Sequence, residues 1–487
     1  MQSNQIIKTE PMVGNWAAEA DVVVIGSGFA GLAAAIEARK VGASVIVCEK
    51  RSTCGGNSII SNGVLAAVGS PMQEREGIQD SPELMCQDIL KAGRGRSDPA
   101  LVKIVAANST QILQWTINEL GIAYKDRVDQ PGGHSVPRCH TPYNASGTAI
   151  IKPLLAKAKE LGIEIKTKTK LTKLLRDSSG EIKGVAICPN SPQKANGSQT
   201  LKSIKVRKAV VLATGGFAGD VQFRTIQDPR LTEEVEDTNR PETTAEALIE
   251  AMRIGGKTVD LSCIQLAPWT SPDEKSFGFG GLFASYAVSP YGILIDPTTG
   301  KRFVNELADR KTRADAILKI EQPCIGIADT EGLKNSKHAM TNPNYDINKY
   351  IQQGVIKRFS TLENIASTYN IPGESLNETL TKFNNYVTNK QDPDFQKTIL
   401  KAARPLQPQY YVIRIWPKIH HTMGGLKINT KAQVVNSNDQ PIKRLYAAGE
   451  VTGGIHGASR LSDCATTECL LFGRIAGCNA AAEEPWD

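Results

Sequence analysis

A glycine-rich loop near the N-terminus limits the possible folds more than any other part of this 487-residue sequence. The loop Gly26-Ser27-Gly28-Phe29-Ala30-Gly31 spells G-x-G-x-x-G and follows the β-branched run Asp21–Ile25, which predicts a buried parallel strand. Leu32–Lys40, which is rich in Ala, predicts a helix. A second strand is expected over Ser44–Cys48, and the acid Glu49 follows it directly. The segment therefore predicts a βαβ unit of the dinucleotide-binding type.

Each residue type in this unit has a physical role in binding a dinucleotide. Gly26, Gly28 and Gly31 permit the tight turn and let the backbone approach a pyrophosphate, whose negative charge the helix N-terminus stabilises. Glu49 stands at the spacing that lets an acid accept hydrogen bonds from the adenosine ribose. An isolated G-x-G-x-x-G is often an ordinary tight turn, but here the strand, the helix and the acid accompany it. Ser27 and Ala30 are expected to line the same site.

Later glycine-rich segments favour FAD over NAD as the dinucleotide. Cys54–Ser58 and Ser61–Gly63 lie directly behind the ribose acid, which suits a ligand that continues past the pyrophosphate towards a flavin. Lys208–Gly216 and Leu445–Glu450 each read as a strand followed by a glycine turn. Singly, each is a strand end with a glycine cap, whereas together they can converge on one extended FAD. The expected cofactor contacts in these segments are Lys50, Gly56, Asn57, Ser58, Asn62, Gly63, Thr214 and Gly215.

Composition excludes several other classes of protein. A net charge of +7 over this length, without a long run of Lys or Arg, gives no argument for nucleic acid, and no stretch reaches the roughly 20 apolar residues of a membrane span. The ten cysteines form no C-x-x-C pair, so we predict no zinc ribbon, iron–sulfur cluster, c-type haem or other metal site. No intact signal peptide is evident in the first 20 residues. The compartment stays open, either periplasmic with a signal removed or cytoplasmic.

Motifs along the whole chain resemble the fumarate reductase/succinate dehydrogenase flavoprotein family. The closest likeness is to the flavin part of the soluble flavocytochrome c type of fumarate reductase and to the related acrylate, cinnamate and urocanate reductases. The segments that carry the resemblance, in family order, are Asp21–Gly31, Gly55–Ser58, Ala213–Phe217, Gly300–Glu306, His420–Gly425, Gly449–Gly454 and His456–Arg460.

The resemblance implies an α/β fold, a Rossmann-like FAD-binding domain with an inserted α+β capping domain. The FAD-binding domain would comprise residues 1–262 and 421–487, and the capping or substrate domain residues 263–420. Polar, proline-containing stretches at 230–245 and 267–280 agree with a break between the two. Asn190–Thr200 is predicted to be the tip of a hairpin between two short apolar strands.

The resemblance also implies roles for individual residues in reducing a C=C bond beside a carboxylate. In that reaction a hydride passes from flavin N5 to the β-carbon and a proton to the α-carbon. Arg310 matches the arginine that donates the proton, and His420 and Arg460 match the pair that binds the substrate carboxylate. His421 and Glu450 match residues that contact FAD.

Residue type alone supports simpler interpretations of the three substrate-site residues. Arg310 would form an ion pair with Asp309 or Glu306, His420 would be a buried hydrogen-bonded imidazole, and Arg460 would be a second contact to the pyrophosphate.

The chain departs from the family where fumarate reductases bind a second carboxylate and relay the proton. Ala267, with Trp269 beside it, and the segment around Ser285 and Tyr286 stand where that family has a His, a Thr, a Glu and an Arg. Ser285 or Tyr286, with water, is the only visible replacement for the relay. The expected substrate is therefore acrylate, methacrylate or a cinnamate-like acid rather than fumarate. Asp463 and Cys464 are a further departure near the flavin.

The FAD is expected to be non-covalent, because residues 1–133 contain no histidine to which it could be attached as in membrane-bound family members. Without haem motifs on the chain, a separate electron donor such as a cytochrome c or a reductase subunit is expected. Two alternatives stay open: a flavin dehydrogenase of ketones, of the 3-ketosteroid Δ1 type, with Tyr286, Tyr291 or Tyr143 as base, and a non-catalytic flavoprotein. A fumarate reductase proper is the third possibility.

Overall fold

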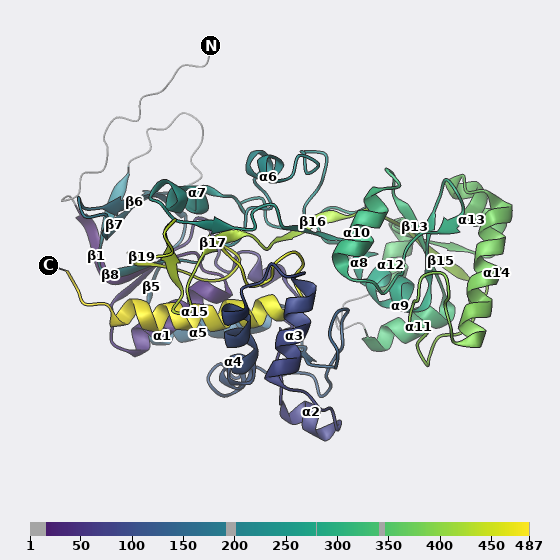
Figure 1. Cartoon of the computed structure of the whole chain (residues 1–487), viewed down its shortest axis with the longest axis horizontal. Helices are drawn as coiled ribbons and strands as arrows, with labels where there is room; N and C mark the ends of the chain where they lie inside the picture. The colour runs from purple at the N-terminus through teal and green to yellow at the C-terminus, as the bar shows by residue number, and fades with distance from the viewer. Residues whose placement is uncertain (1–15, 191–200, 279, 340–345, 487) are drawn as a thin grey trace, which may run out of the picture.

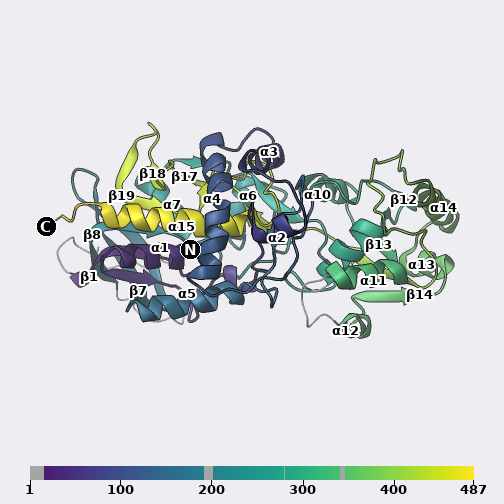
Figure 2. The same ribbon diagram turned by 90° about the horizontal axis from the view of Figure 1, so that it is seen from below.

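The computed structural model describes residues 16–190, 201–278, 280–339 and 346–486. Figure 1 shows two lobes of unequal size, with the N-terminal and C-terminal segments in the larger one and residues from the middle of the chain in the smaller one. Figure 2, turned by 90°, shows the same division from below. The chain passes out of the larger lobe, builds the smaller lobe and returns.

An eight-stranded sheet forms the centre of the larger lobe. Its strands run in the order β18-β19-β8-β1-β2-β5, and β7 adds an antiparallel hairpin by pairing with both β8 and β6. The pairs from β19 to β5 are parallel, as expected when helices cover both faces. The strands are β1 (Trp16–Ile25), β2 (Val45–Cys48), β5 (Glu164–Lys166), β6 (Thr169–Arg176), β7 (Ile182–Pro189), β8 (Lys202–Leu212), β18 (Gln433–Val435) and β19 (Pro441–Ala447).

The predicted βαβ unit is present, with shifted boundaries. Strand β1 begins at Trp16, and helix α1 (Phe29–Lys40) begins three residues before the predicted start. The reason is that the turn is complete within Gly26–Gly28, where Gly26 adopts a φ of +103° and Gly28 is the extended N-cap. The hairpin of β7 and β8 also forms, with Gly184 opposite Lys205, while residues 191–200 of its predicted tip lie outside the described residues.

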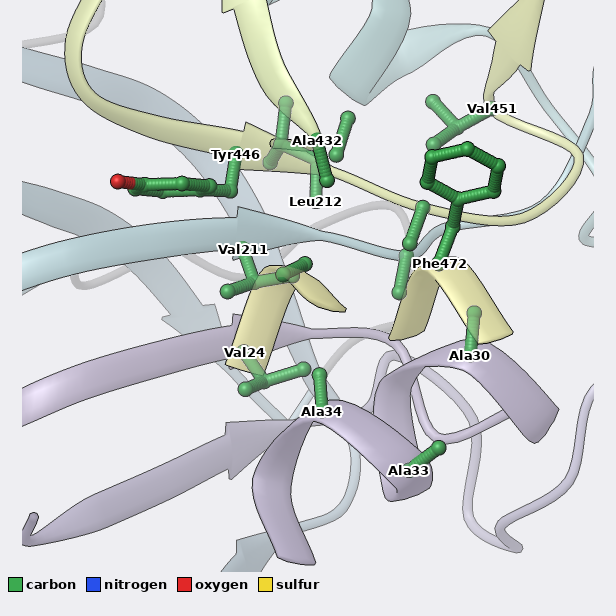
Figure 3. Close-up of a cluster of buried hydrophobic side chains, with 14 of the residues drawn as sticks. Val24, Ala30, Ala33, Ala34, Val211, Leu212, Ala432, Tyr446, Val451 and Phe472 are labelled. Atoms are coloured by element: carbon green, nitrogen blue, oxygen red, sulfur yellow. The ribbon is translucent and has the colours of Figure 1, made fainter. Parts of the chain in front are cut away.

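Helices α1 and α15 (Cys464–Ala482) pack together against the sheet at very short range. Gly473 and Gly477, four residues apart on α15, face the backbone of Ala30 and Ala34, four residues apart on α1. A Cβ atom on either glycine would overlap a carbonyl oxygen of α1. Figure 3 shows Ala30, Ala33 and Ala34 of α1 in one buried cluster with Val24 and Val211 of the sheet and Phe472 of α15. This contact brings the N-terminal ends of both helices close to the glycine-rich loop.

Other helices of the larger lobe cover the sheet and its edges. These are η1 (Ser58–Ile60), α2 (Pro71–Arg75), α3 (Pro82–Ala92), α4 (Pro99–Asn118), α5 (Thr148–Glu160), α6 (Val221–Gln227) and α7 (Glu246–Arg253). Two small sheets complete the lobe, one of β3 (Leu65–Ala66) and β4 (Cys139–His140), and one of β9 (Thr258–Val259), β17 (Gly425–Lys427) and β20 (Thr452–Gly453).

The smaller lobe is an antiparallel five-stranded sheet, in the order β12-β11-β13-β15-β14, with helices around it. The buried residues of its hydrophobic clusters all lie between positions 267 and 415. The main cluster of the larger lobe has no buried member from 263–420. We therefore propose residues 263–420 as the inserted domain. The elements are β11 (Ile293–Asp296), β12 (Lys301–Arg302), β13 (Cys324–Asp329), β14 (Ile356–Phe359), β15 (Tyr410–Ile415), α8 (Gly280–Phe283), the π-helix η2 (Ala284–Val288), α9 (Ser289–Tyr291), α10 (Arg310–Leu318), α11 (Thr330–Ala339), α12 (Ile347–Gln352), α13 (Leu362–Tyr369) and α14 (Gly373–Asn389).

A two-stranded antiparallel ribbon connects the lobes. It consists of β10 (Ile264–Ala267) and β16 (Lys418–Thr422), and β16 lies between the lobes in Figure 1. The register is interrupted, because Gln265 pairs with His421 while the next residue, Leu266, pairs with Ile419. His420 is thus the extra residue of a β-bulge. In the described ranges no helix is long and apolar enough to cross a membrane.

The helix contact gives a testable prediction for stability. Gly477→Val should lower the free energy of unfolding by about 1–3 kcal/mol, because the new side chain would push α15 away from Ala34. Urea denaturation followed by circular dichroism measures this. Cys478→Val, at the neighbouring exposed position of α15, is the control and should change stability little. Equal stability of the two variants would contradict the close packing.

Candidate functional site

The glycine-rich loop is locked between α1 and the end of β8. A Cβ atom on Gly26 would overlap the carbonyl oxygen of Ala213, and one on Gly31 would overlap the carbonyl oxygen of Gly26. No acidic side chain stands in the first turn of α1, so the positive end of the helix is free to face an anion. The sequence therefore needs glycine at these positions for close packing as well as for the turn.

Glu49, directly after β2, is buried and fixed by three hydrogen bonds. Its carboxylate accepts from the Ser27 backbone N–H at 3.1 Å, from the Ser27 hydroxyl at 2.5 Å and from the Arg51 N–H at 2.8 Å. The acid thus holds the glycine-rich loop beside the end of β2. This places a fixed acceptor where an adenosine ribose is expected.

A first cavity opens where the loop, the end of β2 and the end of β8 meet. The sequence-predicted cofactor residues in its wall are Gly26, Ser27, Gly28, Ala30, Glu49, Lys50, Gly56, Asn57, Ser58, Thr214, Gly215 and Glu450. Gly31 stands outside this wall and serves the packing of α1. Lys50 is turned to the segment before α7, where its Nζ donates to Thr244 at 2.7 Å. The predicted dinucleotide residues are therefore gathered in one place.

A second cavity, of about 850 Å³, continues from the first. The two share Phe29, Asn57, Ser58, Arg240, Glu450 and Cys469, so they form one continuous space. Asn62, Gly63 and His421, predicted as cofactor contacts, line the second cavity. Near the junction the buried Nε of Arg240 and Nδ2 of Asn239 have no hydrogen-bond partner among the described residues. Free donors beside a glycine cradle suit an extended dinucleotide such as FAD, which carries phosphate and flavin acceptors.

Three basic side chains meet at the wall of the second cavity: Arg310, His420 and Arg460. Arg310 is the first residue of α10, His420 lies on β16, and Arg460 comes from the loop before α15. The bulge explains why His420 and His421, adjacent on one strand, both line this cavity instead of alternating between faces. The structure thus brings together the residues predicted to hold and protonate the substrate.

The Arg310 guanidinium has no ion pair among the described residues. Its Nη2 donates to the Ser462 hydroxyl at 2.8 Å, the group lies 4.8 Å from the centroid of the Trp269 ring, and Nη1 is buried without a partner. Burial, together with the positive charge of Arg460, lowers the pKa of Arg310 to about 9. An acid of this strength is still protonated at neutral pH.

The simpler interpretation of Arg310, an ion pair with Asp309 or Glu306, does not hold. Asp309 caps α10 through the Lys311 N–H and pairs with Arg94 at 3.0 Å. Glu306 is fully buried and pairs with Arg302 at 2.8 Å. Both carboxylates therefore have other partners, and the Arg310 guanidinium points to the cavity.

Arg460 and His420 are held by uncharged groups. The Arg460 backbone N–H donates to the Gln265 side chain at 3.0 Å, and its Nε is buried without a partner among the described residues. His420 Nδ1 lies 2.8 Å from the Thr238 hydroxyl. Burial and the charges of Arg460 and Arg310 lower the pKa of His420 well below its ordinary value, so the imidazole is neutral.

His421 and Glu450 meet where the two cavities join. His421 Nδ1 lies 3.4 Å from Glu450 Oε1, and the same oxygen accepts from the Thr422 N–H at 3.0 Å. Burial raises the pKa of Glu450 and, with the charge of Arg460, lowers the pKa of His421 well below its ordinary value. Gly216 makes room for this group, because a Cβ there would overlap the Thr422 hydroxyl oxygen.

The predicted apolar wall is only partly in place. Trp269 lines the second cavity, but Ala267 is fully buried within β10 and stands outside both walls. Ser285 and Tyr286 lie in the π-helix η2, and neither is in either wall. Burial and the nearby charge of Asp463 raise the pKa of Tyr286. Ala267 and Ser285 therefore stand apart from the site, whereas Tyr286, although outside both walls, lies near enough to Arg310 to interact with its charge.

Two residues that the sequence did not single out complete the second cavity. The ring centroid of Phe277 lies 6.0 Å from that of His420, and the Trp269 ring lies 6.3 Å from the same imidazole. Thr238 stands in an irregular segment and reaches His420 through its hydroxyl. No motif or periodicity marked either residue, because tertiary contacts alone place them.

Comparison with known proteins agrees with this geometry. A family model described as an FAD binding domain matches residues 21–465. The chain belongs to this family. It is 41% identical to the acrylate reductase flavoprotein subunit of Shewanella woodyi, over 95% of this chain and 91% of the relative. It is thus an FAD-dependent oxidoreductase acting on C=C bonds.

Two solved structures are similar to the fold. The open conformation of a flavocytochrome c3 fumarate reductase superimposes with a TM-score of 0.76 at 33% identity, covering 96% of this chain and 78% of that one. A 3-ketosteroid Δ1-dehydrogenase from Sterolibacterium denitrificans gives a TM-score of 0.77 at 19% identity, covering 96% of this chain and all of the other. The second likeness concerns the fold alone.

The mode of FAD attachment is open to a direct test. The purified protein should be yellow and should release intact FAD on acid precipitation, because residues 1–133 contain no histidine and His421 is engaged by Glu450. Absorbance and chromatography of the supernatant measure the released flavin. As a control for recovery, free FAD is taken through the same precipitation. Flavin that remains in the protein pellet would contradict non-covalent binding.

Proposed function

We propose that the protein reduces the C=C bond of an α,β-unsaturated monocarboxylate, with acrylate, methacrylate or a cinnamate-like acid favoured over fumarate. The observation that carries the proposal is the meeting of Arg310, His420 and Arg460 in one cavity without a carboxylate paired to them among the described residues. Such a group of buried donors is costly unless an anion occupies it. A substrate carboxylate fits that requirement.

The rest of the cavity supports a substrate that is uncharged at its other end. The aromatic rings of Trp269 and Phe277 flank the basic group. Arg224 also lines the cavity, but its guanidinium donates to backbone carbonyl oxygens, including that of Ala218 at 2.7 Å. Arg240 lines the cavity with a free Nε as well, but it stands at the junction with the first cavity, where we assign it to the dinucleotide. A second buried carboxylate beside Trp269 and Phe277 would then lack a free partner, and burying an unpaired charge costs several kcal/mol.

Other cations that could have served a second carboxylate are engaged elsewhere. Arg138 is fully buried and pairs with Asp80 at 2.9 Å and with Asp88. Arg313 lies over the Trp269 ring at 5.4 Å and donates to the Ser289 hydroxyl at 3.1 Å. Lys275 is exposed at the mouth of the cavity. An apolar or aryl group would instead gain from contact with the aromatic rings.

The proposed mechanism divides the work among these residues. The carboxylate is held by Nε of Arg460 and by neutral His420. The hydrogen bonds that these groups donate become stronger as negative charge develops on the carboxylate. When bound, FAD supplies the hydride for the β-carbon. Arg310 donates a proton from Nη1 to the α-carbon, since its Nη2 is held by Ser462. The lowered pKa of Arg310 makes this transfer easier than from a guanidinium in water.

Electrons must reach the protein from a separate donor, such as a cytochrome c or a reductase subunit. The relative from Shewanella woodyi is itself called a flavoprotein subunit, which supports a partner of this kind. A ketone dehydrogenase is less well supported, because it needs a tyrosine base at the substrate. Tyr286 and Tyr291 stand outside both cavity walls, and Tyr143 is 76% exposed.

Arg310 can be tested by substitution. Arg310→Ala should lower kcat for methacrylate by roughly 10²- to 10⁴-fold while FAD stays bound, because the proton donor is lost. Arg310→Lys should recover little, since the reach and fork of the guanidinium are lost. In the wild type kcat/KM should fall as the pH rises through about 9, where Arg310 of the free enzyme loses its proton. Dithionite-reduced viologen serves as electron donor in the assay.

The matched control is Arg94→Ala, which removes an exposed guanidinium that pairs with Asp309 beside the start of α10. This variant should keep most of the wild-type rate. Near-normal turnover of Arg310→Ala would contradict the role of Arg310 as proton donor and leave it a structural role.

The substrate preference can be tested with a panel in the same assay. Methacrylate, acrylate or a cinnamate should exceed fumarate in kcat/KM by at least roughly tenfold, equivalent to about 1.4 kcal/mol. The reason is the missing partner for a second carboxylate beside Trp269 and Phe277. Fumarate as the best substrate would show that a cation such as Lys275 reaches into the cavity. Absence of turnover with every acid would contradict the proposed function itself.

A further inference from the structure

The imidazole of His420 has one hydrogen-bond partner among the described residues, a threonine hydroxyl. The Thr238 Oγ1 lies 2.8 Å from Nδ1 of the imidazole, while the rings of Trp269 and Phe277 contact the imidazole from other directions. Thr238 and His420 both line the second cavity, and Thr238 is 5% exposed. Among the described residues, the Thr238 hydroxyl is thus the hydrogen-bond partner of the His420 ring and can determine how its two nitrogens share a proton.

Thr238 is itself positioned by backbone contacts that do not involve its side chain. Its N–H donates to the carbonyl oxygen of Ile419 at 2.8 Å, which ties it to the strand of His420. Its carbonyl oxygen accepts from the Ser276 hydroxyl at 3.2 Å, which ties it to the segment that carries Phe277. The neighbouring Asp237 forms a parallel bridge with Ile419. Two other segments, β16 and the segment around Ser276, thus fix the backbone of Thr238 beside His420.

The direction of this hydrogen bond follows from the partners present. A threonine hydroxyl has one hydrogen to donate and lone pairs to accept with. Within the described residues His420 Nδ1 is the only hydrogen-bond partner of Thr238 Oγ1. If the hydroxyl accepted from Nδ1–H, its own hydrogen would have no acceptor among the described residues, which costs more than an idle lone pair. The hydroxyl therefore donates, Nδ1 accepts, and the imidazole proton stands on Nε2.

We propose that Thr238 is a positioning residue that fixes the tautomer of His420, so that Nε2–H is presented to the substrate carboxylate. The inference rests on the proposed function, because it assumes that a carboxylate binds beside His420 and Arg460. It adds a residue from an irregular segment to the machinery of the site.

The tautomer matters because the imidazole is neutral. Burial and the charges of Arg460 and Arg310 lower the pKa of His420 well below its ordinary value, so the ring carries one proton only. With that proton on Nε2, the ring donates to an anion. With the proton on Nδ1, the Nε2 lone pair would face the carboxylate and repel it. A cationic imidazole would not need Thr238, but the two guanidinium groups nearby disfavour that form.

Substitution of Thr238 in the FAD-loaded enzyme tests the role in binding. Thr238→Val removes the hydroxyl at nearly constant shape and should raise both KM for methacrylate and the Kd for propionate by roughly tenfold, with a smaller change in kcat. Thr238→Ser keeps the hydroxyl and should restore most of the affinity. Propionate binding is measured through the flavin absorbance spectrum. Wild-type affinity in Thr238→Val, or a loss in Thr238→Ser as large as in Thr238→Val, would overturn the proposal.

Thr116→Val is the matched control for loss of a buried hydroxyl. Thr116 is fully buried in α4, outside both cavities, where its hydroxyl donates to the Leu113 carbonyl oxygen at 2.7 Å. It should leave KM and propionate binding close to the wild-type values. A loss of affinity equal to that of Thr238→Val would mean that general destabilisation causes both effects, and it would overturn the positioning role.

The tautomer can also be read without any turnover. In protein labelled with ¹⁵N-histidine, long-range ¹H–¹⁵N spectra distinguish Nε2–H from Nδ1–H, and comparison with His420→Gln assigns the signal. We expect Nε2–H in the wild type and a mixture in Thr238→Val. Nδ1–H in the wild type would overturn the inference even if the enzyme reduces methacrylate. If the wild type shows Nε2–H but reduces no enoate, the proposed function is contradicted. The assignment of the tautomer would then still hold.

Discussion

The site depends on the mutual repulsion of positive charges that the fold buries together. Arg310 and Arg460 line one cavity, and each lowers the pKa values of the imidazoles beside them. Uncharged groups, not carboxylates, hold the two guanidinium groups: the Ser462 hydroxyl and the Trp269 ring for Arg310, and the Gln265 amide for the backbone of Arg460. Because these partners carry no charge, they leave the positive potential of the cavity in place for an anion.

That arrangement requires both lobes and the ribbon between them. Arg310 belongs to α10 of the smaller lobe, Arg460 to the larger lobe, and His420 to the ribbon strand β16. The N-cap of α10, Asp309, pairs with Arg94 of the larger lobe, so an ion pair between the lobes stands next to the proposed proton donor. The separation of catalytic parts across the lobes, visible in Figure 1, makes their relative position part of the chemistry.

The sequence predicted the βαβ unit of the dinucleotide half because that unit is local. The glycine-rich loop, α1, β2 and Glu49 follow one another within 30 residues, and the spacing alone defines the geometry. The substrate half could not be derived in this way. Ala267 was expected at the wall from the family resemblance, but its side chain is fully buried within β10 and stands outside both cavity walls. Thr238 and Phe277 lie in irregular segments, so neither periodicity nor a motif could mark them.

The proposed selectivity and the proposed acid chemistry have one physical cause. The charge of Arg460 is part of what lowers the pKa of Arg310, so a carboxylate bound to Arg460 offsets that effect and holds the proton on Arg310 more firmly. Arg310 then stays in its acid form while the substrate binds, and it releases the proton only when negative charge develops at the α-carbon nearby. A neutral ketone would leave the repulsion between the cations unrelieved, and a dicarboxylate would bring a second charge to aromatic walls. A monoanion would relieve the repulsion between Arg310 and Arg460 without placing a second charge beside the aromatic rings.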